Sequence, residues 1–185
     1  MTAAITLHRG DITRETGVDA IVNAANTSLL GGGGVDGAIH RAAGPRLLAE
    51  TRTLGGCATG DAKISGGYDL PVAHVIHTVG PVFSASRAET CDRLLASAYR
   101  RSLEVAHENG LRSLAFPSIS TGVYRFPVER AARVAIAEVL EVSARLGDID
   151  EVRWVLFDDA TLHAYEQALA EALPGTDDGA GLSAD

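Results

Sequence analysis

Four consecutive glycines, Gly31 to Gly34, constrain this chain more than any other feature of its sequence. Glycine loses more backbone freedom on folding than other residues, so such a run is costly unless the backbone must approach another group or adopt positive φ. A flexible linker between domains is the alternative explanation. Here an apolar segment and a polar loop precede the glycines, and a segment with helical spacing follows at once. We therefore interpret the run as part of a folded unit.

The helix after the glycines is predicted to begin near Val35, with Ala38, Ile39, Ala42 and Ala43 on one face. The first amides of a helix have no partner within it and lie at the positive end of its dipole, so they bind anions. The stretch therefore favours a phosphate group as ligand.

The pattern G-x-G-x-x-G, a dinucleotide-binding motif, also occurs here as Gly32, Gly34 and Gly37. In that motif the glycines follow the strand directly, whereas here the segment from Asn23 to Gly31 intervenes. A nicotinamide-dependent oxidoreductase would also need a ribose-binding acid at the end of the next strand, and none is evident. This class is kept as a third hypothesis.

The charge balance bears on how a phosphate could be held. The net charge is −8 at pH 7, with 16 Lys and Arg against 24 Asp and Glu, which argues against nucleic acid as the main partner. Main-chain amides and helix dipoles would have to bind the phosphate instead. The 185 residues, 46% of them hydrophobic, suit one soluble domain. The absence of a signal segment and of a membrane-length apolar run predicts a cytoplasmic protein without a membrane partner.

Metal and disulfide sites are not expected. Cys57 and Cys91 are the only cysteines and lie in no C-x-x-C pair, so we predict two free thiols. His74 and His77 are three residues apart in a predicted strand and face opposite sides of the sheet, so they form no two-histidine metal site. We predict neither a metal nor a cofactor.

Strands and helices are predicted to alternate along the chain. The strands are expected at Ala4–His8, Val18–Val22, Ala62–Ser65, Ala73–Val79, Ser113–Phe116 and Val152–Phe157. Further helices are expected over Pro45–Leu54, from a capping box at Ser86–Glu89 to Gly110, from Pro127 to near Gly147, and from Asp158 or Asp159 to Pro174. This order predicts an α/β fold, a three-layer α/β/α sandwich around a mixed, largely parallel central sheet. We expect one domain over residues 1–174 and a disordered acidic tail over residues 175–185.

A second loop, Pro117 to Tyr124, is rich in small and hydroxyl-bearing residues and lies between a predicted strand and a helix. Ligands of parallel sheets bind beyond the carboxyl ends of the strands. If the strands before the two loops are close in the sheet, two amide-rich loops would hold a diphosphate from either side. Ser118, Ser120 and Thr121 would add hydroxyl groups.

Five segments together resemble a macrodomain of the MacroD type. They are GDIT at Gly10–Thr13, VNAAN at Val22–Asn26, GGGGVDGAIHRAAG at Gly31–Gly44, HTVGPV at His77–Val82 and FPSISTGVYRFP at Phe116–Pro127. The similarity covers roughly Ile5 to Leu173. It implies ADP-ribose as ligand, hydrolysis of O-acetyl-ADP-ribose, and removal of ADP-ribose from acidic side chains of mono-ADP-ribosylated proteins.

The resemblance also implies roles for individual residues. Asp11 would accept the adenine amino group beside the amide of Ile12, and Phe157 would stack on adenine. By themselves, Asp11 is typical of a turn cap and Phe157 of a core residue. The diphosphate would be bound by one loop of Gly32, Gly33, Gly34 and Val35 and by another of Ser118, Ser120, Thr121, Gly122 and Val123, with Tyr124 over the distal ribose.

Asp36 is the only carboxylate in the glycine stretch, and its role is open from the residues alone. An acid in the first turn of a helix is favoured by the dipole without any catalysis. The resemblance favours catalysis, in which Asp36 orients and polarises a water and a ligand phosphate shares the base role.

Asn26, Asn23 and His40 complete the predicted site. Asn26 can donate to and accept from a ribose diol, or be a turn residue. Asn23 is more typical of a structural residue, and His40 can pair with Asp36 one helical turn away. The resemblance thus implies ester hydrolysis, with a non-catalytic ADP-ribose-binding module as the alternative. Because Cys57 and Cys91 are far apart in the sequence and the histidines are scattered, we predict that the hydrolysis is metal-independent. Binding-only members often lack the equivalents of Asn26 and Asp36, which are both present here.

Overall fold

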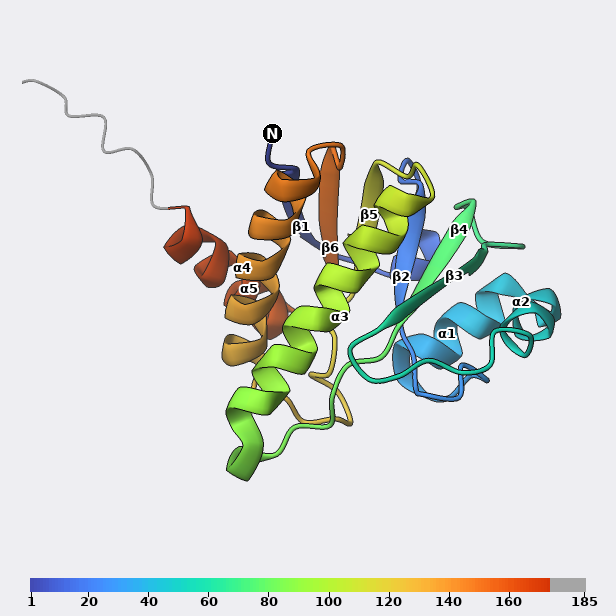
Figure 1. The fold of residues 1–185 in the computed structure, drawn as a ribbon, viewed down its shortest axis with the longest axis horizontal. Helices are drawn as coiled ribbons and strands as arrows, with labels where there is room; N and C mark the ends of the chain where they lie inside the picture. Colours follow the sequence, from blue (N-terminus) through green and yellow to red (C-terminus); the bar gives the residue numbers. More distant parts are fainter. Residues whose placement is uncertain (174–185) are drawn as a thin grey trace, which may run out of the picture.

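A six-stranded sheet forms the centre of the protein in the computed structural model, which describes residues 1–173 (Figure 1). The strands are β1 (Ala4–Arg9), β2 (Ala20–Ala24), β3 (Ala62–Gly66), β4 (His74–Thr78), β5 (Ser113–Phe116) and β6 (Glu151–Leu156). Their order is β1-β6-β5-β2-β4-β3, and every neighbouring pair is parallel except the antiparallel β3 and β4. The predicted mixed, largely parallel sheet is confirmed. The tail predicted over residues 175–185 lies outside the described residues.

Helices cover both faces of this sheet. They are α1 (Gly34–Ala43), α2 (Pro45–Thr51), α3 (Ala88–Glu108), α4 (Val128–Leu146) and α5 (Asp159–Ala172), with short 3-10 turns η1 (Ile12–Arg14) and η2 (Ala85–Arg87). Successive strand residues point to opposite faces. Phe116 and Trp154 accordingly pack in one core with α3, α4 and α5, whereas Ala115 and Val155 pack in another with α1 and α2. Figure 1 shows the two groups of helices on separate sides, so the predicted three-layer α/β/α sandwich is confirmed.

Local sequence signals determine several helix ends. Pro127 directly precedes α4, and Gly147 follows its last residue with φ of 79°, a conformation that glycine adopts without strain. Asp158 caps α5, because its carboxylate accepts a hydrogen bond from the amide of Thr161 at 2.7 Å. Of the two acids predicted as alternatives, Asp158 is therefore the cap.

The capping box predicted at Ser86–Glu89 is wrong. Helix α3 begins at Ala88 with Arg87 in the N-cap position, and no side chain caps it. Ser86 lies within η2, a turn closed by the amide of Arg87 donating to the carbonyl of Ser84 at 3.0 Å. Because an N-cap residue needs extended backbone at the helix start, a serine inside the preceding turn cannot supply the cap.

Strand β2 begins and ends two residues later than the predicted Val18–Val22. Val18 is buried, but the chain joins the sheet only after Asp19, whose carboxylate accepts hydrogen bonds from the amides of Arg112 at 2.7 Å and Ser113 at 3.1 Å. The shift places Asn23 within the strand instead of after it. A polar side chain is thereby enclosed in the middle of the fold.

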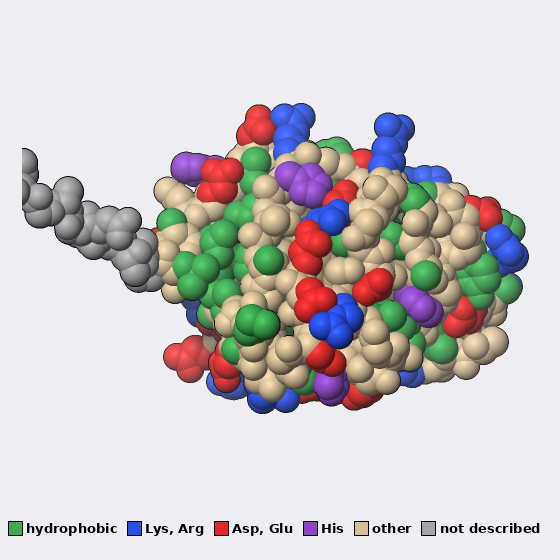
Figure 2. Space-filling view, turned by 90° about the horizontal axis from the view of Figure 1, so that it is seen from above, with side chains coloured by type: hydrophobic (Ala, Val, Ile, Leu, Met, Phe, Trp, Pro, Cys, Tyr) green, Lys and Arg blue, Asp and Glu red, His purple; other side chains and the backbone are tan. Residues whose placement is uncertain are grey.

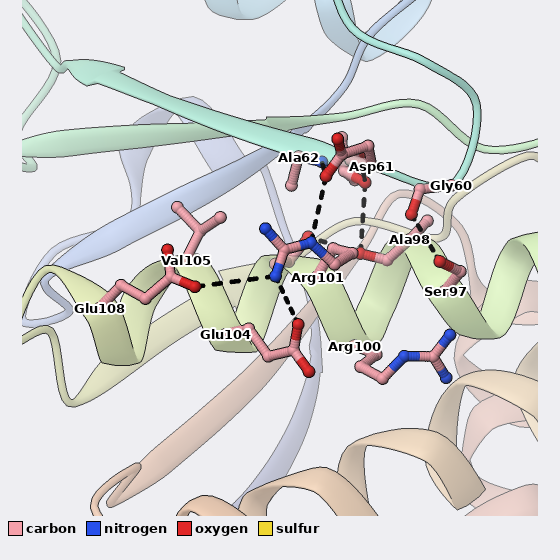
Figure 3. A network of polar contacts seen from close by, with 12 residues as sticks. Gly60, Asp61, Ala62, Ser97, Ala98, Arg100, Arg101, Glu104, Val105 and Glu108 are labelled. Carbon is pink, nitrogen blue, oxygen red and sulfur yellow. Dashed lines mark hydrogen bonds and ion pairs between the residues drawn. The ribbon is translucent and has the colours of Figure 1, made fainter.

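A polar network holds the segment before β3 against α3 (Figure 3). Arg101 of α3 pairs with Asp61 at 3.1 Å and also with Glu104, while Ser97 donates a hydrogen bond to the carbonyl of Gly60 at 2.7 Å. Single exposed ion pairs contribute little to stability, so the connected arrangement matters more than any one of its bonds. The antiparallel edge strand is fastened in this way to the helix that packs behind it.

Charge is mixed on the face of the molecule drawn in Figure 2. Basic and acidic side chains are interspersed there among polar and apolar ones, instead of gathering into one basic surface. This arrangement agrees with the net charge of −8 and offers no broad attraction for a nucleic-acid backbone on that face. Within residues 1–173, every helix is too short or too polar to cross a membrane.

Candidate functional site

The two loops singled out in the sequence meet at one cleft of about 470 Å³. They meet because β2 and β5 are neighbours in the sheet, so the segments after their carboxyl ends lie side by side. The first segment contributes Asn26, Gly32, Gly33, Gly34, Val35 and Asp36 to the lining. The second contributes Ser118, Ser120, Gly122, Val123 and Tyr124. Gly33 and Gly122, the central glycines of the two loops, thus face the same space.

The structure explains why the third position of the G-x-G-x-x-G pattern, Gly37, is a glycine. A Cβ atom at this position would lie 2.5 Å from the carbonyl oxygen of Gly32, so the glycine loop packs directly on the first turn of α1. The pattern therefore reports close packing between loop and helix, which the sequence alone did not assign. Gly31 and Gly34 have φ of 90° and 58°, as expected for glycines that turn the chain.

Replacing Gly37 with Ala should weaken binding of a phosphorylated ligand, because the new methyl group displaces the Gly32 carbonyl and the amides after it. We expect a loss of about 1–3 kcal/mol in binding free energy, the range typical of forced repacking. Calorimetric titration with ADP-ribose measures the change, and circular dichroism verifies that the variant is folded. Unchanged affinity would mean that the loop adjusts freely.

Gly80 is a cleft residue that the sequence analysis missed, together with Ala24 and Ala25. A Cβ atom on Gly80 would lie 2.1 Å from the hydroxyl oxygen of Ser120 and 2.6 Å from Cγ2 of Ile119. Only glycine allows the second loop to pack so closely on the segment after β4. Gly80 lies inside the HTVGPV segment, but nothing in that motif indicated contact with the other loop.

Two buried tyrosines support the second loop from behind. Tyr165 donates a hydrogen bond to the hydroxyl of Ser118 at 3.1 Å, and Tyr99 OH lies 3.2 Å from Tyr165 OH. Burial raises the pKa of both phenols, which keeps them neutral. Thr121 donates its hydroxyl to Ser118 at 2.7 Å and does not line the cleft, so this predicted ligand residue acts within the loop.

Asp36 is held in a defined orientation at the inner end of the cleft, with 4% of its surface exposed. Its Oδ1 accepts a hydrogen bond from Nδ2 of Asn23 at 2.8 Å and lies 3.4 Å from Nε2 of His40. The latter contact has the distance of an ion pair but not the geometry of a hydrogen bond. Oδ2 lies on the loop side, since a Cβ atom on Gly32 would be 3.1 Å from it.

Asn26 has one of the two roles considered for it, that of a turn residue, and it also borders the cleft. Its Nδ2 donates to the carbonyl of Gly31 at 3.0 Å, and its Oδ1 accepts from the amide of Ser28 at 3.2 Å and from the Ser28 hydroxyl at 2.6 Å. The side chain therefore fixes the loop as a turn asparagine does. It also lines the cleft beside Gly32, so its role toward a ribose stays a prediction.

Asn23 and His40 lie behind the cleft wall. Neither lines the cleft; Asn23 is fully buried on β2, and His40 is one turn after Asp36 on α1. His77 on β4 lies beyond Asn23, and its Nδ1 is 3.1 Å from Nδ2 of Asn23. Burial lowers the pKa of His77 to about 4, with a further lowering by His40 and an opposing effect of Glu50.

The free energy of unfolding should decrease on acidification, over the pH range between the folded and unfolded pKa values of His77. Its folded pKa lies below the unfolded value of about 6.5, so the unfolded chain binds more protons between pH 4 and 6.5. The stabilisation is complete above pH 6.5 and declines on acidification to about pH 4, by on the order of 3 kcal/mol. Urea unfolding at both ends of this range measures the decline, which should be smaller in His77→Leu. An equal decline in both proteins would assign it to other groups.

Asp11 and Phe157 lie at a second position on the same edge of the sheet. They follow β1 and β6, whose last residues Arg9 and Leu156 are paired. Asp11 caps η1 by accepting hydrogen bonds from the amide and hydroxyl of Thr13 at 3.0 and 2.7 Å, and these bonds hold its pKa below the usual range. Phe157 is 88% exposed, so the interpretation as a core residue is wrong.

Ile12 and the remaining predicted sites can also be placed. Ile12 is buried in the core beside α1, and it lies outside the cleft lining together with Asp11 and Phe157. Within residues 1–173, no three His, Cys, Asp or Glu side chains are arranged to hold a metal ion. Cys57 and Cys91 are buried free thiols, as predicted.

Comparisons with known proteins agree with this geometry. A three-layer α/β/α domain with glycine- and hydroxyl-rich loops around one cleft is typical of proteins that bind phosphorylated ligands. The sequence model of the Macro domain family matches residues 22–135, and a macro domain-containing protein of Chlorobaculum tepidum is 59% identical over 88% of this chain and 93% of its own length. The chain therefore belongs to the macro domain family.

Longer relatives and solved structures complete the comparison. The ADP-ribose glycohydrolase MACROD2 of Xenopus laevis is 52% identical over 94% of this chain, which spans 42% of that protein's length. The Oceanobacillus iheyensis macrodomain with ADP superposes with a TM-score of 0.86 at 41% identity, over 91% of this chain and 90% of that one. The Trypanosoma brucei macrodomain in complex with ADP-ribose gives 0.81 at 44% identity, over 89% and 68%.

Proposed function

We propose that this protein binds ADP-ribose and hydrolyses esters at its distal ribose. The substrates are O-acetyl-ADP-ribose and mono-ADP-ribose attached to Asp or Glu side chains of proteins. The observation that carries the proposal is one buried, oriented carboxylate, Asp36, beside a cleft enclosed by two amide-rich loops. The similarity to ADP-ribose glycohydrolases, and to macrodomains solved with ADP and ADP-ribose, supports the choice of ligand.

The diphosphate is bound without basic side chains. No Lys or Arg of the described residues lines the cleft, whereas the N-terminus of α1 opens into it through Gly33, Gly34 and Val35. Unpaired amides at a helix N-terminus attract phosphate oxygens, and the dipole adds to that attraction. The second loop, around Gly122, encloses the diphosphate from the other side. An acidic protein can bind an anionic ligand in this way.

The adenine end of the ligand extends toward the ends of β1 and β6. There the exposed ring of Phe157 supplies a stacking surface, and Asp11 supplies the acceptor for the exocyclic amino group. Thr13 uses only Oδ1 of Asp11, and Oδ2 has no hydrogen bond but a 3.9 Å ion-pair contact with the exposed Arg14, so Oδ2 is the oxygen that would accept from the ligand.

The reaction takes place at the distal ribose, next to Asp36 and Asn26. Asp36 orients and polarises a water through Oδ2, and the water oxygen attacks the ester carbonyl carbon. The bond between the carbonyl carbon and the ribose oxygen then breaks. The ribose oxygen takes a proton, and O-acetyl-ADP-ribose yields ADP-ribose and acetate. Asp36, or a phosphate of the ligand, carries the proton between the two oxygens. Asn26 holds the ribose hydroxyl groups.

An assay with purified protein and O-acetyl-ADP-ribose tests the proposal. We expect free ADP-ribose and acetate to accumulate in equal amounts, with the same rate in the presence of a chelator because the reaction is metal-independent. Tight binding of ADP-ribose without product formation would favour the non-catalytic binding module. NAD should bind far more weakly than ADP-ribose, and the reverse preference would favour a dinucleotide enzyme.

A modified protein as substrate needs its own measurement. The MACROD2 relatives extend well beyond the region that matches this chain, so their targets do not transfer with the similarity. We expect release of ADP-ribose from a protein carrying it on Glu or Asp, and none from one carrying it on Arg. The cytoplasmic location stays a prediction.

A further inference from the structure

A ladder of buried polar side chains runs behind Asp36, across three strands. Asn23 of β2 and His77 of β4 are directly paired in register, and Ser65 of β3 is diagonal to His77 because it pairs with Val75. All three point to the face of the sheet that α1 and α2 cover, and their exposed fractions are 0%, 0% and 3%. Burying three polar side chains together costs free energy unless their polar atoms form hydrogen bonds. The ladder leads straight to the proposed catalytic carboxylate.

The contacts along the ladder allow only one arrangement of hydrogens. Nδ2 of Asn23 has two hydrogens, one donated to Oδ1 of Asp36 at 2.8 Å and the other to Nδ1 of His77 at 3.1 Å. The opposite orientation of the amide would place its oxygen against a carboxylate. Nδ1 of His77 must therefore be unprotonated, and Nε2–H donates to Ser65 Oγ at 2.7 Å, which in turn donates to the carbonyl of Gly66 at 3.1 Å.

Two acceptors, Oδ1 of Asp36 and Nδ1 of His77, direct the rotation of the Asn23 amide. Its Oδ1 is buried and has no hydrogen-bond partner among the described residues. If Nδ1 of His77 were missing, one amide hydrogen would also lose its partner, and only the bond to Asp36 would direct the amide. That bond, which holds Oδ1 of Asp36 and leaves Oδ2 on the loop side, would then be less strictly oriented.

We propose that His77, backed by Ser65, is a positioning residue for ester hydrolysis, which acts on Asp36 through Asn23. The inference rests on the proposed function, since it concerns the reaction and not the fold alone. His77 itself is fully buried and touches no ligand, so it takes no part in proton transfer with the substrate. Neutral imidazole is required, and the low pKa of His77 keeps it neutral over the physiological range. His40 on α1 and Glu50 on α2 are the titratable groups that act on its pKa, and Asp36 on α1 is reached through Asn23.

Four variants separate positioning from mere structural support. His77→Leu removes both ring nitrogens at similar volume, and His77→Asn restores an acceptor near the place of Nδ1. Ser65→Ala removes the partner of Nε2–H, which lets the ring adopt the other tautomer. His74→Leu is the matched control, because this second histidine of β4 lies on the opposite face of the sheet.

The measurements are kcat with O-acetyl-ADP-ribose and the Kd of ADP-ribose. We expect His77→Leu to lower kcat by up to about 100-fold, the effect of a misplaced reacting group, with little change in Kd. His77→Asn should recover most of this loss, Ser65→Ala should show a smaller loss, and His74→Leu should match the wild type. A folded His77→Leu protein with wild-type kcat would overturn the inference, as would an equal loss in both His77 variants.

Nitrogen-15 spectra of the wild-type protein give a readout that does not depend on activity. We expect the His77 ring to be neutral at pH 7, with Nε2 protonated and Nδ1 bare. The opposite tautomer would overturn the inference even if His77→Leu failed to fold, and Ser65→Ala would then supply the kinetic comparison. Absence of turnover in the wild type would instead contradict the proposed function, and with it the reaction that His77 serves.

Discussion

Replacing Asp36 with Ala should lower turnover of O-acetyl-ADP-ribose by about 10²–10⁴-fold, the usual contribution of a positioned acid or base. Binding of ADP-ribose should persist, because the loop amides and the adenine site do not depend on this carboxylate. The substitution removes the group that accepts the Asn23 hydrogen bond and faces the glycine loop. Steady-state kinetics and calorimetric titration measure the two quantities on the same preparation.

The competing explanation for Asp36 is its place in the first turn of α1, where any acid is favoured by the helix dipole. Glu129 provides the matched control, since it occupies the first turn of α4 and is no part of the cleft lining. Glu129→Ala should cost about 0.3–1 kcal/mol of unfolding free energy at most and leave turnover unchanged. If Asp36→Ala behaved the same way, its carboxylate would have only a structural role.

Truncation of two aromatic residues in one segment should change the free energy of unfolding by very different amounts. Trp154 on β6 is fully buried, with ring centroids of Phe116 and Tyr165 each 5.6 Å away, so Trp154→Ala should cost about 3–5 kcal/mol of unfolding free energy. Phe157 is 88% exposed, so Phe157→Ala should change stability by no more than about 0.5 kcal/mol. Chemical denaturation measures both.

The Phe157→Ala variant also tests the proposed adenine site. Stacking of a base on an aromatic ring contributes about 1–3 kcal/mol, so Phe157→Ala should weaken ADP-ribose binding by roughly 5- to 150-fold. Because the diphosphate and ribose sites are unaffected, binding of ribose 5-phosphate should be the same in Phe157→Ala and wild type. Equal affinity of the variant and the wild type for ADP-ribose would show that adenine binds elsewhere.

Local sequence patterns predicted the ends of helices and strands correctly where the contacts that determine those ends are close in the chain. The ends of α4 at Pro127 and Gly147 and the cap at Asp158 follow from φ preferences and side-chain hydrogen bonds within a few residues. The capping prediction for Ser86 was wrong because Ser86 lies inside the preceding 3-10 turn η2, which the hydrogen bond from the Arg87 amide to the Ser84 carbonyl closes. Val18 failed as a strand residue because pairing with the distant segment around Ser113 determines where β2 begins.

The sequence by itself determined that a glycine-rich loop and a hydroxyl-rich loop would each follow a buried strand and precede a helix, and that one acid, Asp36, would accompany the first of them. It did so because backbone freedom, helix dipoles and hydrophobic alternation are properties of short segments. Only the tertiary structure decided that Gly80 packs on Ser120, that Phe157 is exposed, and that Asn23 and His77 stand behind Asp36. These contacts join β2, β4 and the segments after β4, β5 and β6. Which strands become neighbours depends on the free energy of the whole fold, and no single segment contains that information.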